Sequence, residues 1–553
     1  MKSVRHAISR RTLLRQVAPA GALLVGGVLL QACGGSNSNS NPAPTPQPTE
    51  PVKQTGALPT TVPVSTPTGV PVAAPPTSAP AATPAAGSST AVPASATPVG
   101  KVAGDLQIWV GTNYQPSASM EKSAQNLQPH NAVVRVGDAY KKLHPEVGKL
   151  DFVVVPTTTD ARLWTETAQA GGTIPHISWQ HSFQIDDDVH KNWWVPLDPF
   201  VAQPNHYIKA GDPGSKVWIE EFYEIPTSTK RSIDGHLYVI PYDLITTFYY
   251  YNKDLFKKAG LDPEAAPKTW AEFEKIQQTL KDKGIGPTGH TSWWSDTQVA
   301  QMVFSSIADK VHPGGGPVLR KEVECAIKNG IWDYNTPMAA DYLRILKAEV
   351  PFSDPDWAST ALTADAWRQK FMTQQDAIME DHTQLVGLLQ SDPQLGFQWG
   401  AFSCPTITKE TSQFSTGRPA PPIGGATSTQ LAITTRAVKE EREALAVDFL
   451  MYFCTPKNAA LVIGELNNRL PNIKGVNVAE DLKGPLNAIA NGYGEAAMFV
   501  YGDKVSRETD QKRADAIKLM RLGKADIPTT QKTIQDLQMQ GALADIKQNN
   551  WSC

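Results

Sequence analysis

The chain has 553 residues, which is too many for a single hydrophobic core. It carries 51 Lys and Arg against 54 Asp and Glu, a net charge of −3, and 41% of its residues are hydrophobic. This balance excludes a nucleic-acid binder driven by overall positive charge, and it excludes a wholly disordered chain.

The first 32 residues have the order of a bacterial export signal. Five basic residues and no acidic residue lie within positions 1–16, and an uncharged run follows from Val17 to Leu30. This run suits the apolar core of a signal peptide and is short for a membrane span. Residues 9–14, Ser-Arg-Arg-Thr-Leu-Leu, resemble a twin-arginine signal, and Leu30-Gln31-Ala32-Cys33 resembles a lipobox. We therefore expect removal of residues 1–32 and a lipid on Cys33 that anchors the protein to the outer face of the cell membrane.

The next segment, residues 33–100, has the composition of a tether. Positions 34–100 hold 15 of the 44 prolines and only two charged residues, Glu50 and Lys53. Such a stretch buries too little apolar surface to offset its ordering entropy, so we expect a disordered, partly polyproline-II linker. All 14 tryptophans lie after residue 101, which indicates a folded part of residues 101–553 and two large lobes.

Loss of the leader changes the charge of the mature protein. Five basic residues leave with it, so 46 basic residues face 54 acidic ones, a net charge of −8. This argues against nucleic acid or an anionic bilayer as the main partner.

The exported location permits disulfides among the four remaining cysteines, Cys325, Cys404, Cys454 and Cys553, which allow three full pairings. Cys454 ends the apolar run 449–454, which favours a core position. No Cys-x-x-Cys spacing is present, so zinc and thioredoxin-like sites lack support.

Strand and helix patterns alternate in the first part of the folded region. Residues 106–110, 150–156 and 174–179 read as strands, and the second of these is expected to be buried on both faces. Between them, residues 138–144 and 161–170 read as helices. This alternation predicts an α/β lobe with a largely parallel sheet.

Further along, residues 238–242 and 247–251 read as two adjacent strands. Thr269 and Glu272 form a capping box that opens a helix closed near Gly284, with Trp270, Phe273, Ile276 and Leu280 on its core face. Residues 439–453 predict another helix.

Several segments resemble one protein family. Residues 234–243 read Asp-Gly-His-Leu-Tyr-Val-Ile-Pro-Tyr-Asp, and residues 250–261 read Tyr-Tyr-Asn-Lys-Asp-Leu-Phe-Lys-Lys-Ala-Gly-Leu. This block, continued by Lys-Thr-Trp-Ala-Glu-Phe at 268–273, resembles the signature of family 1 extracellular solute-binding proteins, the sugar-capturing components of ABC importers. Shorter matches are Val-Pro-Leu-Asp at 195–198, Ala-Val-Asp-Phe-Leu at 446–450 and Arg-Leu-Pro at 469–471.

The resemblance implies two α/β lobes, each a largely parallel sheet flanked by helices, joined by about three hinge crossings that close on a ligand. The first lobe would comprise residues 101–243 and 424–466, and the second residues 244–423 and 467–553. It also implies delivery of the ligand to ABC permease subunits by a monomer without cofactor or catalysis. One departure stands out: residues 377–383 read Ala-Ile-Met-Glu-Asp-His-Thr, where the family usually places a Gly-rich strand and a stacking aromatic residue.

Sugar recognition needs flat aromatic faces for the C–H side of the ring and polar groups for the hydroxyls. In open α/β sheets such groups lie at the carboxyl ends of strands and at the crossings between lobes. The candidates in those places are Asn113, Tyr114, Trp179, Gln180, His181, Tyr242, Asp243, His290, Trp293, Trp294, Glu380, Asp381, His382, Gly425 and Thr427.

Other interpretations stay open at this point. A surface-anchored glycoside hydrolase would need two carboxylates across a cleft, for which Asp243 and Asp381 are candidates. A binding protein for a polyol phosphate, polyamine or peptide is a third reading, although the candidate loops lack the Arg and Lys that a phosphate needs. His176, His181 and Asp186–Asp188 could be grouped as a metal cluster, but their spacing matches no known site type and favours an exposed acidic loop.

Overall fold

The computed structural model describes residues 100–121, 128–156, 160–291, 295–313, 318–359, 363–421, 429–478, 480, 483 and 507–553. These residues belong to one compact unit, Ala86–Cys553. The predicted leader, Cys33 and the tether up to residue 99 lie outside the described residues, as do the candidates Trp293, Trp294, Gly425 and Thr427.

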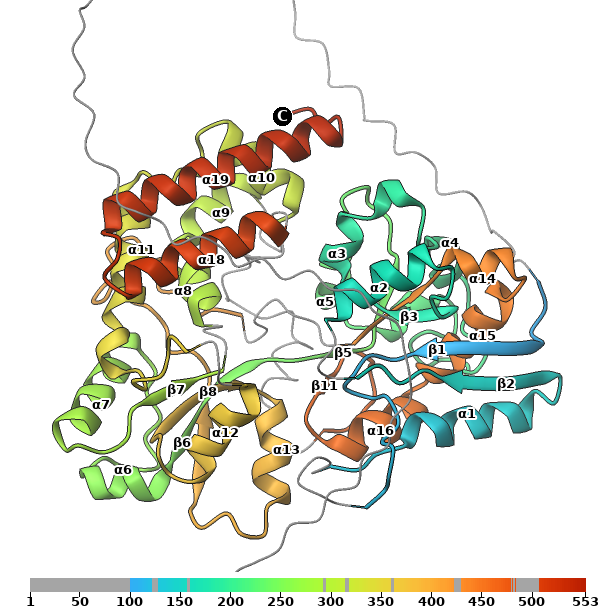
Figure 1. Ribbon diagram of the computed structural model, residues 1–553, viewed down its shortest axis with the longest axis horizontal. Helices are drawn as coiled ribbons and strands as arrows, with labels where there is room; N and C mark the ends of the chain where they lie inside the picture. Colours follow the sequence, from blue (N-terminus) through green and yellow to red (C-terminus); the bar gives the residue numbers. More distant parts are fainter. Residues whose placement is uncertain are drawn as a thin grey trace, which may run out of the picture. The chain divides into compact units, whose positions relative to one another are not determined.

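The first lobe is built on a five-stranded sheet in the order β2-β1-β3-β10-β4 (Figure 1). Its strands are β1 (Gly104–Trp109), β2 (Val147–Phe152), β3 (Ile177–Trp179), β4 (Val239–Pro241) and β10 (Gln430–Ile433). Its helical segments are α1 (Ala132–Leu143), α2 (Ala161–Ala170), α3 (Ser182–Asp186), η1 (Val189–Lys191), α4 (Asp198–Val201), η2 (Trp218–Glu221), α5 (Glu224–Ser228), α14 (Thr435–Lys439), α15 (Glu443–Phe453) and α16 (Pro456–Leu466).

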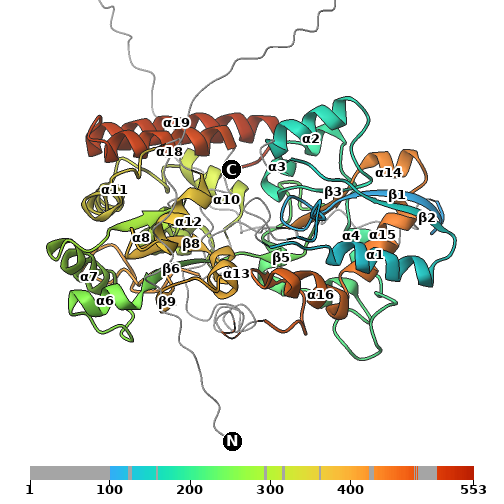
Figure 2. The same ribbon diagram turned by 60° about the horizontal axis from the view of Figure 1, so that its bottom comes forward.

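The second lobe is built on a four-stranded sheet in the order β7-β8-β6-β9. Its strands are β6 (Thr247–Asn252), β7 (Thr288–His290), β8 (Ile378–His382) and β9 (Trp399–Phe402). Its helical segments are α6 (Lys253–Ala259), α7 (Trp270–Asp282), α8 (Ser295–Val303), α9 (Ser305–Val311), α10 (Arg320–Lys328), α11 (Pro337–Ala348), η3 (Val350–Phe352), α12 (Ala364–Met372), α13 (Gln384–Ser391), α18 (Arg507–Arg521) and α19 (Ile527–Gln548). The last two helices, red in Figure 2, lie side by side and pack against α10 and α11.

A two-stranded ladder lies between the two sheets. β5 (Asp243–Leu244) follows β4 directly and pairs antiparallel with β11 (Leu470–Pro471). The chain passes from the first sheet to the second through β5, and β11, which follows α16 of the first lobe, runs antiparallel beside β5.

The predicted α/β fold with two lobes, each on a largely parallel sheet, is confirmed, and each sheet contains one reversed strand. In the first sheet β1 runs parallel to β2 and β3, whereas β10 pairs antiparallel with both β3 and β4. In the second sheet β7 pairs parallel with β8, and β6 is antiparallel to β8 and β9. Each sheet is thus largely parallel in strand direction, with one reversed strand, β10 in the first sheet and β6 in the second. A strand that enters from a hinge is free of the right-handed crossover that forces parallel pairing.

Local patterns were reliable where they were strong. Helix α2 has the predicted bounds, and α7 begins with the predicted capping box: Glu272 N–H donates to Thr269 Oγ1 at 3.3 Å, and Thr269 N–H donates to Glu272 at 3.1 Å. Trp270, Phe273 and Leu280 are buried, and Cys454 lies in the core as predicted.

Two local predictions were wrong. β2 is an edge strand and is not buried on both faces, since Gly148 and Lys149 are exposed. The helix predicted over 439–453 is two helices, α14 and α15, because Glu441 takes a φ of 56° and Arg442 N–H turns back to the Ala437 carbonyl at 2.7 Å.

The structure selects one cysteine pairing among those the sequence left open. Cys325 of α10 is bonded to Cys553, and Cys404 and Cys454 are buried free thiols. No helix among the described residues is long and apolar enough to cross a membrane.

The capping box yields a test of the second lobe. We expect Thr269→Ala to lower the free energy of unfolding by about 1 kcal/mol, because the Glu272 N–H loses its acceptor. Urea unfolding measures the change. Thr279→Ala on the same helix removes a hydroxyl that donates to the Lys275 carbonyl and should be neutral; equal losses in the two variants would contradict the role of the cap.

Candidate ligand-binding site

The first-lobe side of the candidate site lies at the carboxyl ends of β1 and β3. The turn after β1 packs directly on Trp179 at the end of β3, and a Cβ on Gly111 would lie 2.7 Å from the Trp179 ring. Gly111 also has a φ of +81°, so only glycine fits both the conformation and the contact. Asn113, two residues further on in this turn, is half-buried.

Aromatic rings form a continuous row from this point. Buried Trp109 packs edge-on against Trp164 at 4.5 Å and Trp179 at 5.5 Å between ring centroids. Trp179 packs edge-on against His181 at 4.5 Å, and His181 stacks on Phe183 at 4.9 Å. Trp164, Trp179, His181 and Phe183 are all partly exposed, so the row presents ring surface to solvent.

The segment that follows this row reaches the second lobe. Helix α3 directly follows His181, and the carboxylate of Asp186 at its end lies 3.8 Å from Arg320 of α10 in the second lobe. Gln180, by contrast, points inward: it is fully buried, its N–H donates to the Gln430 carbonyl, and its side chain donates to Gln184.

Asp243 occupies the centre of the crossings between the lobes. Its carboxylate accepts hydrogen bonds from the Tyr114 hydroxyl and from the Thr429 N–H, both at 2.6 Å, and lies 3.9 Å from Arg469 Nε. Burial raises the pKa of Asp243, and the nearby Arg469 opposes that rise. Burial likewise lowers the pKa of Arg469. The pair is therefore two desolvated groups that depend on each other.

The two tyrosines predicted here are interior. Tyr242 exposes none of its side chain, stacks on Phe453 at 4.8 Å, and meets Tyr114 edge-on at 6.0 Å. Tyr114 is 2% exposed. Tyr114 thus bonds Asp243 from the first-lobe core, and Tyr242 packs against Tyr114.

The second-lobe side of the site is the end of β8. Asp381 is fully buried and accepts from Arg368 Nε at 2.7 Å, Thr291 Oγ1 at 3.1 Å and its neighbour His382 N–H at 2.8 Å. Burial lowers the pKa of His382 to about 4, so its imidazole is neutral at physiological pH.

Glu380 is also engaged. It lies 2.5 Å from His290 Nδ1 and accepts from the Ser295 N–H at 2.6 Å. The three carboxylates that the sequence placed near the cleft, Asp243, Glu380 and Asp381, are thus all buried and bonded to protein groups.

Arg368 and Arg469 are the residues that the sequence reading missed. The candidate loops themselves contain no Arg or Lys, but the fold brings these two arginines beside Asp381 and Asp243. Arg368 comes from helix α12 and Arg469 from the segment between α16 and β11. In the sequence, Arg469 stood out only as part of the Arg-Leu-Pro match. The residue pattern of α12 does not indicate that Arg368 pairs with Asp381 of β8, because that pair is a tertiary contact.

The Asp186–Asp188 loop is also not the exposed acidic loop expected. Asp188 is fully buried and bonded to Arg162 at 2.6 and 2.7 Å, and Asp186 accepts from Ser232 at 2.6 Å. Among the described residues, no group of His, Cys, Asp and Glu could hold a metal ion.

Comparison with known proteins decides the family. The family model described as bacterial extracellular solute-binding protein matches residues 124–460, more than half of the chain. The chain belongs to this family. The resemblance found in the sequence is therefore confirmed, and the family is one of solute binding.

Solved structures of similar fold cover most of the chain. They include a chitin oligosaccharide binding protein (TM-score 0.56, 18% identity, 80% of this chain and 100% of that one). Maltose-bound MalE3 of T. maritima has a TM-score of 0.55 at 15% identity, covering 79% of this chain and 99% of its own. RafE in complex with raffinose has a TM-score of 0.54 at 16% identity, with the same coverage. At these identities the likeness is one of fold.

Curated relatives match over short stretches only. The sn-glycerol-3-phosphate-binding periplasmic protein UgpB of Brucella abortus is 46% identical over 61 residues, 11% of this chain and 14% of that protein. UgpB of Escherichia coli is 48% identical over 81 residues, 14% of this chain and 18% of its own length. The match thus spans less than a fifth of these relatives.

The site yields a test of its buried pair. We expect Asp243→Ala to lower the free energy of unfolding by about 3–5 kcal/mol, because Arg469 stays buried without its carboxylate. Chemical denaturation measures the loss. Asp365→Ala removes an ion pair to Arg368 whose Asp side chain is 82% exposed, and should cost no more than about 1 kcal/mol. A loss below about 1 kcal/mol for Asp243→Ala would contradict the mutual dependence of the pair.

Proposed function

We propose that the protein captures a carbohydrate, a mono- or oligosaccharide, by closure of its two lobes and delivers it to the permease of an ABC importer. The lobes would be residues 101–243 with 424–466 and residues 244–423 with 467–553. The observation that carries the proposal is the row of partly exposed rings at Trp164, Trp179, His181 and Phe183, which is followed by the segment that reaches Arg320 of the second lobe.

Flat rings suit the apolar face of a pyranose, because the C–H groups of the sugar lie on one side of its ring. The four rings come from α2, the end of β3 and α3, so they are held by regular elements of one lobe. This also compensates for the departure at β8, where the family usually has its stacking residue and this chain has Asp381.

The charges near the site favour a neutral ligand. Asp381 is paired with Arg368, Asp243 faces Arg469, and Glu380 is bonded to His290 and Ser295. A polyamine would need carboxylates that are available to it, and these already have partners within the protein. The same partners occupy the two carboxylates that a glycoside hydrolase would need. We propose no catalysis and no cofactor.

A polyol phosphate is the second candidate. Two arginines near the crossings supply the bidentate donors that a phosphate prefers, and the curated relatives with local similarity are named for sn-glycerol-3-phosphate. Each arginine already lies beside a carboxylate, which weakens this candidate relative to a sugar.

A ligand screen separates the candidates. We expect chitin oligosaccharides, raffinose or maltose to raise the melting temperature of the protein. At a hundredfold excess over Kd, the bound ligand adds about 2.7 kcal/mol to the free energy of unfolding. Sn-glycerol-3-phosphate and spermidine complete the panel. If only sn-glycerol-3-phosphate stabilises the protein, the ligand is a polyol phosphate and the sugar proposal is wrong. If only spermidine stabilises it, both the sugar and the polyol phosphate are wrong.

The aromatic row predicts the outcome of one substitution. Trp179→Ala should weaken binding of the stabilising sugar at least tenfold in calorimetry, because the ring face is lost at the centre of the row. Trp399→Ala removes a half-buried tryptophan from β9 and should lower stability while leaving affinity unchanged. Equal affinities of the wild type and Trp179→Ala would show that the aromatic row is not part of the binding site.

We further propose that the protein is exported, cleaved before Cys33 and held at the outer face of the membrane as a lipid-anchored monomer. Two acyl chains bind a bilayer stably where one is marginal. Fractionation of cells that express Cys33→Ser should find the protein in the soluble fraction, with the wild type in the membrane fraction. Membrane retention of the variant would contradict the lipid anchor.

A further inference from the structure

The two lobes touch at a second place that involves none of the chain crossings. The first-lobe part is the segment 186–190, which comprises the end of α3 and the start of η1. The second-lobe part is the start of α10 and the end of α19. Arg320 Nη1 lies 3.6 Å from Asp187 Oδ1 and 3.8 Å from Asp186 Oδ2. His190 Nε2 lies 3.0 Å from Asn549 Oδ1.

Each side of this contact is anchored in its own lobe. Ile185, next to the acidic residues, packs in a cluster with Val239 of β4 and Ala432 of β10. Asp188 holds the segment from the other end through its bidentate bond with Arg162. The acidic segment is therefore a rigid part of the first lobe.

Arg320 is equally fixed in the second lobe. It is 6% exposed, bonds Glu324 at 3.0 Å, and forms a short ion pair with Asp545 of α19. Residues 323, 326 and 327 of α10 and 534, 542 and 546 of α19 belong to one core cluster with the second sheet.

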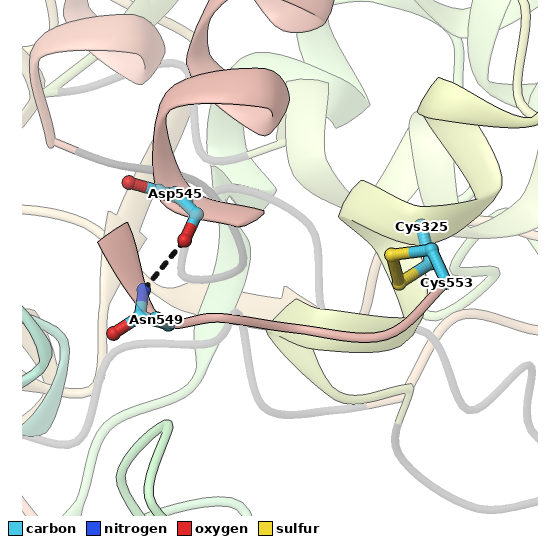
Figure 3. Close-up of a disulfide and its surroundings, with 4 residues drawn as sticks. All are labelled: Cys325, Asp545, Asn549 and Cys553. Atoms are coloured by element: carbon cyan, nitrogen blue, oxygen red, sulfur yellow. Dashed lines mark hydrogen bonds between the residues drawn. A yellow bond between two sulfur atoms is a disulfide. The ribbon is translucent and has the colours of Figure 1, made fainter. Parts of the chain in front are cut away.

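The disulfide ties these two helices together beside the contact. Cys325 lies five residues after Arg320, and Cys553 lies four residues after Asn549 (Figure 3). Asn549 Nδ2 donates to the Asp545 carbonyl at 2.9 Å, so the end of α19 is closed on itself where it meets the first lobe. The disulfide thereby holds Arg320 and Asn549, the two second-lobe residues of the contact, in a fixed position relative to each other.

We propose that Asp187, His190, Arg320 and Asn549 form a clasp between the lobes that favours the closed state and slows ligand release, with Arg320 as its positioning residue. The clasp consists of side-chain contacts only, so it breaks when the lobes separate, whereas the crossings persist in every state. Its role in release depends on the proposed ligand capture. Its effect on lobe separation does not.

Asp187 is the residue at which the clasp can be tested cleanly. Its side chain is 36% exposed, and among the described residues Arg320 is the one cation within ion-pair distance. Asp186 is unsuitable because it also accepts from Ser232 and from the Ile233 N–H within the first lobe. Asp187→Asn thus removes the nearer of the two carboxylates that face Arg320 across the lobes and leaves the bonds of Asp186 within the first lobe in place.

The experiment measures lobe separation without ligand. Dyes on Leu461→Cys of α16 and Leu519→Cys of α18, which are 47% and 46% exposed, report the distance between the lobes by single-molecule fluorescence transfer in the mature chain carrying Cys33→Ser. We expect Asp187→Asn to raise the open-to-closed ratio about two- to fivefold, and Asp187→Lys to raise it further through repulsion from Arg320. Cys404 and Cys454 are buried and escape labelling.

Asp309→Asn is the matched control, because it breaks an exposed ion pair with Arg418 inside the second lobe. It should leave the ratio unchanged. The pair Cys325→Ser and Cys553→Ser should shift the ratio in the same direction as Asp187→Asn. An unchanged ratio in both Asp187 variants overturns the clasp, and an unchanged ratio in the cysteine variant overturns the part assigned to the disulfide.

Stopped-flow release of a bound sugar then tests the consequence. The dissociation rate of Asp187→Asn should rise by the same factor as the open-to-closed ratio, with little change in the association rate. If no sugar binds, the proposed function fails while the fluorescence result still decides the clasp. If Asp187→Asn shifts the open-to-closed ratio but leaves the dissociation rate unchanged, the clasp has no role in ligand release.

Discussion

A single buried carboxylate, that of Asp243, joins the parts of the chain that connect the two lobes. Asp243 begins β5, accepts from the N–H of Thr429 just before β10, and lies beside Arg469 in the segment between α16 and β11. Tyr114 adds the turn that follows β1. Because a desolvated charge is tolerated only with its partners in place, these segments must assemble together or not at all. The position of both lobes, and so of the site between them, depends on this arrangement.

The same principle shapes the chemistry of the site. Each carboxylate near the crossings has a partner, and the two arginines that supply this compensation come from elements that are distant in sequence. What the first lobe offers to the proposed ligand is ring surface at Trp164, Trp179, His181 and Phe183. A surface of that kind recognises shape and apolar area more than net charge, which agrees with a polyhydroxylated neutral ligand.

A protein that closes on its ligand has to keep its lobes connected and still let them separate. The crossings serve the first task and the clasp serves the second. Buried, mutually dependent groups at Asp243 and Arg469 hold the connection in every state, whereas Asp187 lies partly exposed where water can replace Arg320 at small cost. The disulfide between Cys325 and Cys553 adds rigidity on the second-lobe side of that contact without linking the lobes to each other. Strong interactions thus lie within lobes and at crossings, and weak ones lie where the molecule has to open.

By itself the sequence determined the α/β class, the two lobes, the family, the bounds of α2, the capping box of α7 and the core position of Cys454, since these depend on local periodicity, caps and motifs. Tertiary structure alone decided that β2 is an edge strand, that β6 and β10 run antiparallel to their neighbours, and that Cys325 pairs with Cys553. The tertiary structure also places Tyr242 in the core and pairs Arg368 with Asp381. The physical reason is common to all of these: strand order, ion pairing and burial depend on which distant segments meet, and no pattern within one segment records its partner.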